Sequence, residues 1–378
     1  MVVLIRCNDI LSDPRAMKYV RYLQEKGIEH KFIGWDRDGK NIDLPNSVMW
    51  KERAEYNVGG FKAVKNRIGW MWFVYKQLCA LKRKDAILHG CDIDSAFPAA
   101  FYKATHNNGN KLIFDVFDWF SAALYNQKWY VLTAFKLMEK YTTKRADRVI
   151  LCEPERIEQI PFEIPSSKIS VLPNIPFFDC SDFLTKDQEK QFNNNKITFS
   201  YVGGFSTDRC LFEIVSLAEK GIINLSIAGF GNAKLEERLL KDNGLYPNIR
   251  YYGRVKYEDG LNISYNSDIV YAMYQKVNPN NVYAAPNKYY EAMFLAKPIF
   301  STKGTIVEKK VLQNNMGYVS DEKEEDILAV ISRIDIDDAL EKGENANKVW
   351  RETFCGYTRR YLEGEYLELK KTNVTHLR

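Results

Sequence analysis

The stretch APNKYYEAMFLAKPIFS, residues 285–301, combines a predicted helix start with two side chains of opposite charge. Pro286 and Asn287 suit the start of a helix, where the first turn exposes backbone amides and the positive end of the helix dipole. Lys288 adds a full positive charge at that start, and the Glu291 carboxylate can accept hydrogen bonds from vicinal hydroxyls such as those of a ribose. The pattern indicates a site for a phosphorylated ribose, although a solvated first-turn glutamate is the alternative for Glu291.

Glycines follow three successive apolar runs upstream of this stretch. Gly203 and Gly204 follow ITFSYV, Gly229 and Gly231 follow LSIA, and Gly253 follows IRYY. Glycine at the carboxyl end of a parallel strand lets backbone amides approach a phosphate closely. Each glycine alone is also explained by a tight turn, but their succession favours a nucleotide site.

Two arginines stand next to these glycine turns. Arg209, in YVGGFSTDRCLFE, falls where a helix would begin, a position that disfavours a cation unless an anion lies nearby. Arg254 directly follows Gly253 and is a candidate contact near a nucleotide base. Arg209 and Lys288 together could neutralise the charge that develops on a leaving diphosphate. An exposed arginine without a ligand is the alternative for both arginines.

Polar side chains of the N-terminal half form a second candidate group. Asp9 follows the first apolar run, His89 and Asp92 lie in LHGCDID, and Asp115 and Asp118 lie in FDVFDWF. If these runs are neighbouring parallel strands, the side chains reach one edge of the sheet, where a carboxylate can orient or deprotonate an acceptor hydroxyl. A buried structural role is the alternative for His89.

The elements that position these residues are predicted to form an α/β fold. VVLIR, DPRAMKYVRYLQEKG and EHKFIGW indicate a strand, a helix and a strand, with Asp13 as the cap, Pro14 at the first helical position and Gly27 at the end. Strands follow at DAILHG, KLIFDVF and DRVILC, and a second series begins at KITFSYVGG. The length favours two domains, and the polar segment at 174–196 places their boundary near residue 190.

The segment PNKYYEAMFLAKPIFST resembles the nucleotide-diphosphate motif of GT-B glycosyltransferases of the glycosyltransferase group 1 type, family four. SDPRAMKYVRYLQEKG, FIGWDRDG, HGCDIDSAFPA and KLIFDVFDWF also occur in that group's order, so the resemblance covers most of residues 1–320. It implies two Rossmann-like domains that face each other across a cleft, with the acceptor bound by residues 1–190 and the nucleotide sugar by residues 191–349. It further implies a C-terminal helix, about 350–378, that crosses back to the N-terminal domain, and transfer with retention.

The resemblance also assigns residues. Glu291 corresponds to the second glutamate of the family's E-x7-E motif, which holds the ribose, and Arg209 matches a phosphate-binding position. The first glutamate of the motif falls on Tyr283, so we expect Asn280, Asn281 or the amides of residues 284–286 to hold the donor sugar instead. Many relatives carry a histidine where this chain has Phe117 or Asp118, which makes Asp118 a candidate catalytic residue on the acceptor side.

Residues 59–84, GGFKAVKNRIGWMWFVYKQLCALKRK, contain no carboxylate. An apolar helical face is predicted beside basic side chains, and such a helix can lie in an anionic membrane interface with tryptophan at the headgroup level. The residues expected to face the membrane are Lys62, Lys65, Trp70, Trp72, Lys82 and Arg83. A helix packed on the core with solvated lysines is the alternative.

Composition sets the expected compartment and partners. Seven cysteines without a C-x-x-C pair indicate reduced thiols, and no apolar run approaches the length of a membrane span or a signal-peptide core, so a cytoplasmic protein, peripheral on the inner face of the plasma membrane, is expected. A net charge of +5 without a binding motif does not indicate a nucleic-acid partner.

The sequence therefore predicts a hexosyltransferase-type enzyme that moves a sugar from a UDP or GDP sugar to a hydroxyl of a glycan or lipid-linked acceptor, in bacterial surface polysaccharide assembly. No cofactor or metal is expected, because the donor half offers no D-x-D between a strand and a loop, and the cations Arg209 and Lys288 can neutralise the charge that a divalent ion would otherwise neutralise. The alternatives are a nucleotide-sugar epimerase on the same fold and a non-catalytic nucleotide-sugar-binding partner protein.

Overall fold

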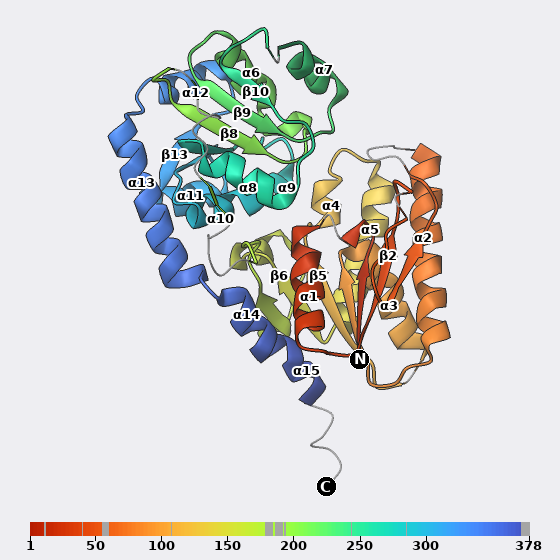
Figure 1. Ribbon diagram of the computed structural model, residues 1–378. Helices are drawn as coiled ribbons and strands as arrows, with labels where there is room; N and C mark the ends of the chain where they lie inside the picture. Colours follow the sequence, from red (N-terminus) through yellow and green to blue (C-terminus); the bar gives the residue numbers. More distant parts are fainter. Residues whose placement is uncertain are drawn as a thin grey trace. The chain divides into compact units, whose positions relative to one another are not determined.

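The computed structural model describes residues 1–10, 13–39, 41–54, 60–106, 108–177, 184–185, 192, 194–242, 244–284 and 286–371. The chain forms two compact units, of which unit 1 comprises Met1–Pro173 with Thr358–Arg378 and unit 2 comprises Asn174–Tyr357 (Figure 1). The units divide after Pro173, upstream of the predicted boundary near residue 190. That residue and much of the predicted linker fall outside the described residues.

Unit 1 contains a seven-stranded parallel sheet in the order β3-β2-β1-β4-β5-β6-β7. The central strands are mostly apolar and almost entirely buried, as parallel sheets covered by helices on both faces require. The strands are β1 Val2–Arg6, β2 His30–Trp35, β3 Ser47–Trp50, β4 Ile87–Cys91, β5 Lys111–Val116, β6 Arg148–Leu151 and β7 Ile169–Val171.

The helices of unit 1 are α1 Pro14–Glu25, α2 Gly60–Leu81, α3 Ile93–Thr105, α4 Phe120–Ala123 and α5 Trp129–Arg145, with 3₁₀ turns at Pro154–Gln159 and Ser166–Lys168. The predicted cap of α1 is confirmed, since the Asp13 side chain accepts hydrogen bonds from the amides of Arg15 and Ala16. Helix α3 packs against both α2 and α5, so these three helices form one layer.

Unit 2 contains a six-stranded parallel sheet in the order β10-β9-β8-β11-β12-β13. Its strands are β8 Thr198–Val202, β9 Asn224–Ala228, β10 Ile249–Tyr251, β11 Ile269–Ala272, β12 Ile299–Thr302 and β13 Gly317–Ser320. Its helices are α6 Leu211–Glu219, α7 Ala233–Asp242, α8 Tyr257–Tyr265, α9 Pro279–Val282, α10 Asn287–Phe294, α11 Ile306–Gln313, α12 Glu324–Ile331 and α13 Ile336–Val349, with a 3₁₀ turn at Thr207–Arg209. The predicted α/β class with two parallel sheets is confirmed.

The C-terminal segment continues after α13 through a π-helical turn, Trp350–Phe354, to α14 Tyr357–Tyr361, a second π-helical turn Leu362–Tyr366 and α15 Leu367–Lys371. From Thr358 onward it belongs to unit 1. The Tyr361 hydroxyl and Ser170 Oγ form a hydrogen bond of 2.8 Å, and the Tyr366 ring contacts the Tyr19 ring of α1. The segment therefore covers the α1 side of the unit 1 sheet.

Among the described helices, none combines the length and the apolar character needed to cross a membrane.

Candidate functional site

The glycine turns of unit 2 lie against each other at the carboxyl ends of β8 and β9. The amide of Gly203 donates to the Ala228 carbonyl at 3.0 Å, and the amide of Phe205 donates to the Phe230 carbonyl at 2.7 Å. Gly229 has φ 145°, and a Cβ there would stand 1.9 Å from the Gly203 carbonyl oxygen. Only glycine allows two loops to approach this closely.

Lys288 reaches the first of these turns from α10. A Cβ at Gly203, which has φ 148°, would stand 2.7 Å from Lys288 Nζ, so the ammonium occupies the space that a side chain would fill. Lys288 is 8% exposed and lies 4.4 Å from the centroid of the Tyr201 ring. No hydrogen bond or ion pair joins its ammonium to any residue that the structure describes. It is a nearly buried cation that forms no ion pair in that part of the chain.

Opposing effects act on the charge of Lys288. Burial lowers its pKa, but Tyr201, Tyr274 and Glu291 raise it by more, so the pKa lies above its ordinary value and the group is an ammonium. Glu291 is 9% exposed, and Asn287 is half-buried at the first position of α10. Pro286 precedes α10, and no side chain of a described residue caps that helix start. The backbone amides there are suited to an anion.

Arg209 ends the 3₁₀ turn that leads into α6. Its guanidinium lies 2.8 Å from Asp208 Oδ1 and stacks over the Tyr274 ring at 4.0 Å from the centroid. Asp208 is held in turn by the amide of Asn281, which donates to Asp208 Oδ2 at 2.8 Å. Burial raises the pKa of Asp208, but Arg209 and the hydrogen bonds together lower it by more. The pKa therefore lies below its ordinary value and the carboxylate is ionised. The pair is therefore charged and oriented.

Arg209 and Lys288 thus converge on one pair of tyrosines. Tyr274 lies under Arg209 and also acts on the charge of Lys288, while Tyr201 lies under Lys288. The two cations repel each other, which lowers the pKa of Lys288 in opposition to the tyrosines. An anion bound between them and the glycine turns would relieve that repulsion.

Sequence reasoning missed the supporting residues of this site, Asp208, Tyr201 and Tyr274. Asp208 adjoins Arg209 in the chain, and that adjacency was the one local signal available. The side chain of Asn281, one of the groups expected to hold the donor sugar, donates its Nδ2 to Asp208 and to the Gln275 carbonyl. It positions the Arg209 turn.

Three further predicted residues have less defined places. Arg254 is exposed and stacks over the Phe230 ring, 4.5 Å from the centroid, next to the second glycine turn. Gly204 has open space around it, and its carbonyl accepts a hydrogen bond of 2.6 Å from the Tyr201 hydroxyl. Gly231 donates its amide to Glu236 Oε1 at 2.7 Å.

Unit 1 has a charged network at the carboxyl ends of β1, β4 and β5. Asp92 caps α3 with φ 64°, a value that non-glycine residues rarely adopt and that often marks a functional position. Its carboxylate binds the Arg6 guanidinium and accepts hydrogen bonds from the amides of Phe117, at 3.0 Å, and Asp118, at 3.2 Å. Burial raises the pKa of Asp92 to about 6 despite the opposing effect of Arg6. Asp92 therefore holds the loop that carries Asp118.

Asp118 and Asp9 differ in exposure. The Asp118 side chain is half-exposed and lies 3.7 Å from an Arg156 guanidinium nitrogen. Asp9 is buried just beyond the end of β1. Both therefore lie at strand ends, as the sequence predicted.

His89 lies in the interior, which contradicts its predicted acceptor-side role. It is in the middle of β4, fully buried, with its Nδ1 2.9 Å from the Tyr366 hydroxyl of the C-terminal segment. Burial lowers its pKa more than Asp115 raises it, so the ring is neutral. An acceptor cannot reach the ring there, and we assign His89 a structural role.

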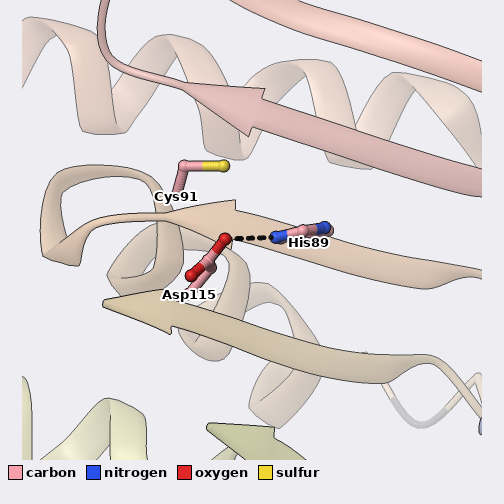
Figure 2. Close-up of side chains that lie close together, drawn as sticks. All are labelled: His89, Cys91 and Asp115. Atoms are coloured by element: carbon pink, nitrogen blue, oxygen red, sulfur yellow. Dashed lines mark ion pairs between the residues drawn. The ribbon is translucent and has the colours of Figure 1, made fainter. Parts of the chain in front are cut away.

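His89, Cys91 and Asp115 lie close together, and each offers an atom that could bind a metal ion (Figure 2). Both Asp115 oxygens are already bonded, because Arg15 donates to each of them and the Tyr19 hydroxyl donates to Oδ2 at 2.7 Å. The Arg15 guanidinium supplies the positive charge that a metal ion would otherwise bring, and it lowers the pKa of Asp115 against the effect of burial. Burial also keeps the pKa of the Cys91 thiol well above its usual range. These residues form a buried ion-pair network and do not suit a cation.

The basic helix predicted near residues 59–84 is α2, and its faces differ from the prediction. Trp70, expected at the membrane, is fully buried and stacks on Trp35 with ring centroids 5.8 Å apart. The helix is apolar on several sides, so periodicity did not identify the face that packs on the core. Trp72 is exposed as expected, and so are Lys62, Lys65, Lys82 and Arg83.

No protein-family model matches the sequence, and no curated protein matches it. The fold, in contrast, is shared with solved structures across nearly the whole chain. Sucrose-phosphate synthase from Thermosynechococcus elongatus has a TM-score of 0.74 at 15% identity, and the match covers 98% of this chain and 99% of that one.

Two further structures extend this likeness. The Escherichia coli trehalose-6-phosphate structure bound with UDP-2-fluoro glucose has a TM-score of 0.69 at 12% identity, covering 98% of this chain and 99% of that one. A protein assigned as a UDP-N-acetylglucosamine 2-epimerase from Listeria monocytogenes has a TM-score of 0.63 at 13% identity, covering 98% and 96%. At such identities the likeness shows the fold alone, and it confirms the predicted GT-B fold class.

Proposed function

We propose that the protein is a glycosyltransferase that moves a sugar from a nucleoside-diphosphate sugar to an acceptor hydroxyl. The observation that carries this proposal is the position of Lys288, a nearly buried ammonium held against a glycine turn at the carboxyl end of a parallel strand. Ligands of open α/β sheets bind at this edge, and a diphosphate would pair with the Lys288 ammonium, which forms no ion pair with a described residue.

Each residue of the site then has a role in the transfer. The turns at Gly203 and Gly229 leave space for phosphate oxygens, and Arg209 and Lys288 neutralise the charge that grows on the diphosphate as the bond to the sugar breaks. Glu291, one turn further along α10, accepts hydrogen bonds from the ribose hydroxyls. The E. coli structure with bound UDP-2-fluoro glucose supports a UDP sugar as the donor class.

On the acceptor side we assign Asp118 and Asp9 to contact the incoming hydroxyl. Asp92 is a positioning residue, because its oxygens are occupied by Arg6 and by the amides of the loop that carries Asp118. The reaction proceeds with retention, the donor diphosphate accepting the proton of the attacking hydroxyl on the same face. We further propose that it requires no metal ion, since two cations already face the diphosphate position.

The donor is a UDP or GDP sugar, and the acceptor is a glycan or a lipid-linked sugar in bacterial surface polysaccharide assembly, in the cytoplasm at the inner face of the membrane. The exposed basic and aromatic side chains of α2 support a lipid-linked acceptor.

A second candidate is a nucleotide-sugar epimerase, which the likeness to the Listeria protein favours. An epimerase releases a changed nucleotide sugar without an acceptor. A non-catalytic partner protein would bind the nucleotide and turn over neither substrate.

A turnover assay distinguishes the glycosyltransferase, the epimerase and the non-catalytic partner protein. The protein is incubated with UDP-glucose or GDP-mannose, with and without lipid-linked and free glycan acceptors, and nucleoside diphosphate release is measured. We expect release that depends on the acceptor and persists in a chelator. Arg209→Ala should lower kcat by about 10²- to 10³-fold, whereas Arg333→Ala, at an exposed position of unit 2, should leave kcat unchanged. A changed nucleotide sugar formed from donor alone would establish the epimerase instead.

A further inference from the structure

The outer side of the α2, α3 and α5 layer of unit 1 carries exposed apolar side chains. On α2 these are Val64, Ile68 and Trp72, spaced one helical turn apart, with Trp72 56% exposed. On α5 they are Trp129, Tyr130 and Leu137, with Trp129 77% exposed. Apolar side chains gathered on a surface mark an interaction site more often than scattered ones do.

The α2 and α5 parts of this surface are connected through α3 and through one contact between α2 and α5. Helix α3 packs against both α2 and α5, and Arg67 of α2 extends its guanidinium over the Phe135 ring of α5, 4.9 Å from the centroid. Arg67 follows Val64 and precedes Ile68, so that contact brings the exposed end of α2 beside α5. We call this set of α2 and α5 side chains the apolar-basic surface; α2 runs along one edge of unit 1 (Figure 1).

The charge of the surface has one sign. Helices α2, α3 and α5 contain two carboxylates, Asp94 and Glu139, and both are buried. The exposed lysines of α2 and α5 include Lys65, Lys76, Lys136, Lys140 and Lys144. Lys103 of α3 is held by Asp147, 2.5 Å away, and we leave it out of the set. No exposed carboxylate of these three helices offsets the lysines.

We propose that the apolar-basic surface docks unit 1 on an anionic lipid bilayer, with Trp72 and Trp129 inserted at the headgroup level and the lysines paired with lipid phosphates. Tryptophan with one apolar body and one polar nitrogen suits this interface, and each basic residue near an anionic leaflet adds to the binding. The surface itself does not depend on the proposed transferase activity. The inference that the acceptor is lipid-linked does rest on that activity.

The other side of the unit 1 sheet is already covered, which leaves the α2, α3 and α5 layer as the proposed membrane side. Helix α1 and the C-terminal segment cover that side, and the rings of Tyr366 and Tyr19 contact each other there. Tyr361 and Tyr366 are buried. The aromatic side chains of the C-terminal segment therefore serve internal packing, whereas those of the apolar-basic surface face outward.

The test is cosedimentation of the full chain with vesicles of phosphatidylcholine alone and of phosphatidylcholine mixed with phosphatidylglycerol. We expect binding to the anionic vesicles that falls as salt rises, and little binding to the neutral ones. Trp72→Ser/Trp129→Ser and Lys65→Glu/Lys136→Glu should each weaken binding by more than about tenfold. Both variants alter exposed side chains, so their thermal unfolding should match that of the parent.

The matched control is Lys234→Glu/Leu240→Ser on α7 of unit 2, which removes an exposed lysine and an exposed leucine elsewhere and should bind vesicles as the parent does. Parent protein that stays in the supernatant with anionic vesicles would overturn the proposal. The proposal would also be overturned if both surface variants bound anionic vesicles as tightly as the parent. A parent dimer that the Trp72→Ser/Trp129→Ser variant converts to a monomer would show instead that the surface pairs two copies of the chain. Nucleotide binding, measured separately, distinguishes these outcomes from failure of the proposed function.

Discussion

Replacing Lys288 with methionine separates its role in ligand binding from its role in folding. Methionine keeps most of the apolar stem and removes the ammonium that lies against Gly203. In the free protein, burial of the charge opposes folding and the Tyr201 ring favours it, so we expect the free energy of unfolding to change by less than about 1 kcal/mol.

Ligand binding should respond far more strongly. A hydrogen bond to a charged group contributes about 1.5–3 kcal/mol, so loss of the Lys288 contact to a diphosphate should raise the dissociation constant roughly 10- to 150-fold. Calorimetric titration with UDP and GDP measures this change directly, alongside thermal unfolding without ligand.

The control is Lys309→Met, which removes an exposed lysine of α11 in the same unit. We expect its nucleotide affinity to equal that of the parent. If Lys288→Met bound the diphosphate as tightly as the parent, or if Lys309→Met lost as much affinity, the assignment of Lys288 to the diphosphate would be refuted.

Three further predictions concern other residues. Gly229→Ala should destabilise the fold by about 2 kcal/mol or more because its Cβ would strike the Gly203 carbonyl, whereas Gly204→Ala, with open space around it, should unfold like the parent but bind the diphosphate more weakly; thermal unfolding and calorimetry check both. Glu291→Ala should weaken binding of the nucleoside diphosphate more than that of its 2′-deoxy analogue, and equal losses would exclude a ribose contact. Burial raises the pKa of Glu139, which is 1% exposed, to about 7. Because this folded-state pKa exceeds the unfolded value, stability declines as pH rises from about 4.5 to about 7; Glu139→Gln should therefore be more stable than the parent at about pH 8, by up to about 3 kcal/mol in denaturant unfolding, and equal to it at about pH 4.

Local signals were enough to predict the elements that carry Lys288 and the glycine turns. The helix start at Asn287 and the glycine turns depend on residues within a few positions, and the structure places Lys288 against Gly203 at the predicted strand end. The contacts of Asp208, Tyr201 and Tyr274 depend on loops from different strands that meet only in the folded unit, so no spacing in the sequence predicted them.

The burial of residues that are covered by distant segments could not be predicted from the sequence either. His89 follows an apolar run like the other predicted strand ends, but it is covered by Tyr366 from the far end of the chain. Trp70 and Trp72 are two residues apart on a helix that is apolar on several sides, and only the packing of α2 on β2 and α3 decides which of them is buried.

The strands that sequence reasoning did not name are edge strands. β3, β7 and β13 each lie at the end of a sheet, are short, and include partly exposed residues. An edge strand needs no long apolar run, because one of its sides lacks a neighbouring strand. The central strands, which are buried on both faces, were all recognisable.

The central claim is that unit 2 binds a nucleoside diphosphate at Lys288 and Glu291. Thermal unfolding of the intact protein and of Glu291→Ala, with UDP, GDP, ADP and CMP, tests it most directly. At about 100 times its dissociation constant, a ligand adds about 2.7 kcal/mol to the stability. We predict that one diphosphate stabilises the parent and that Glu291→Ala loses most of that shift. If no nucleotide stabilised the parent, the site would not be a nucleotide site and the proposed transferase activity would be contradicted.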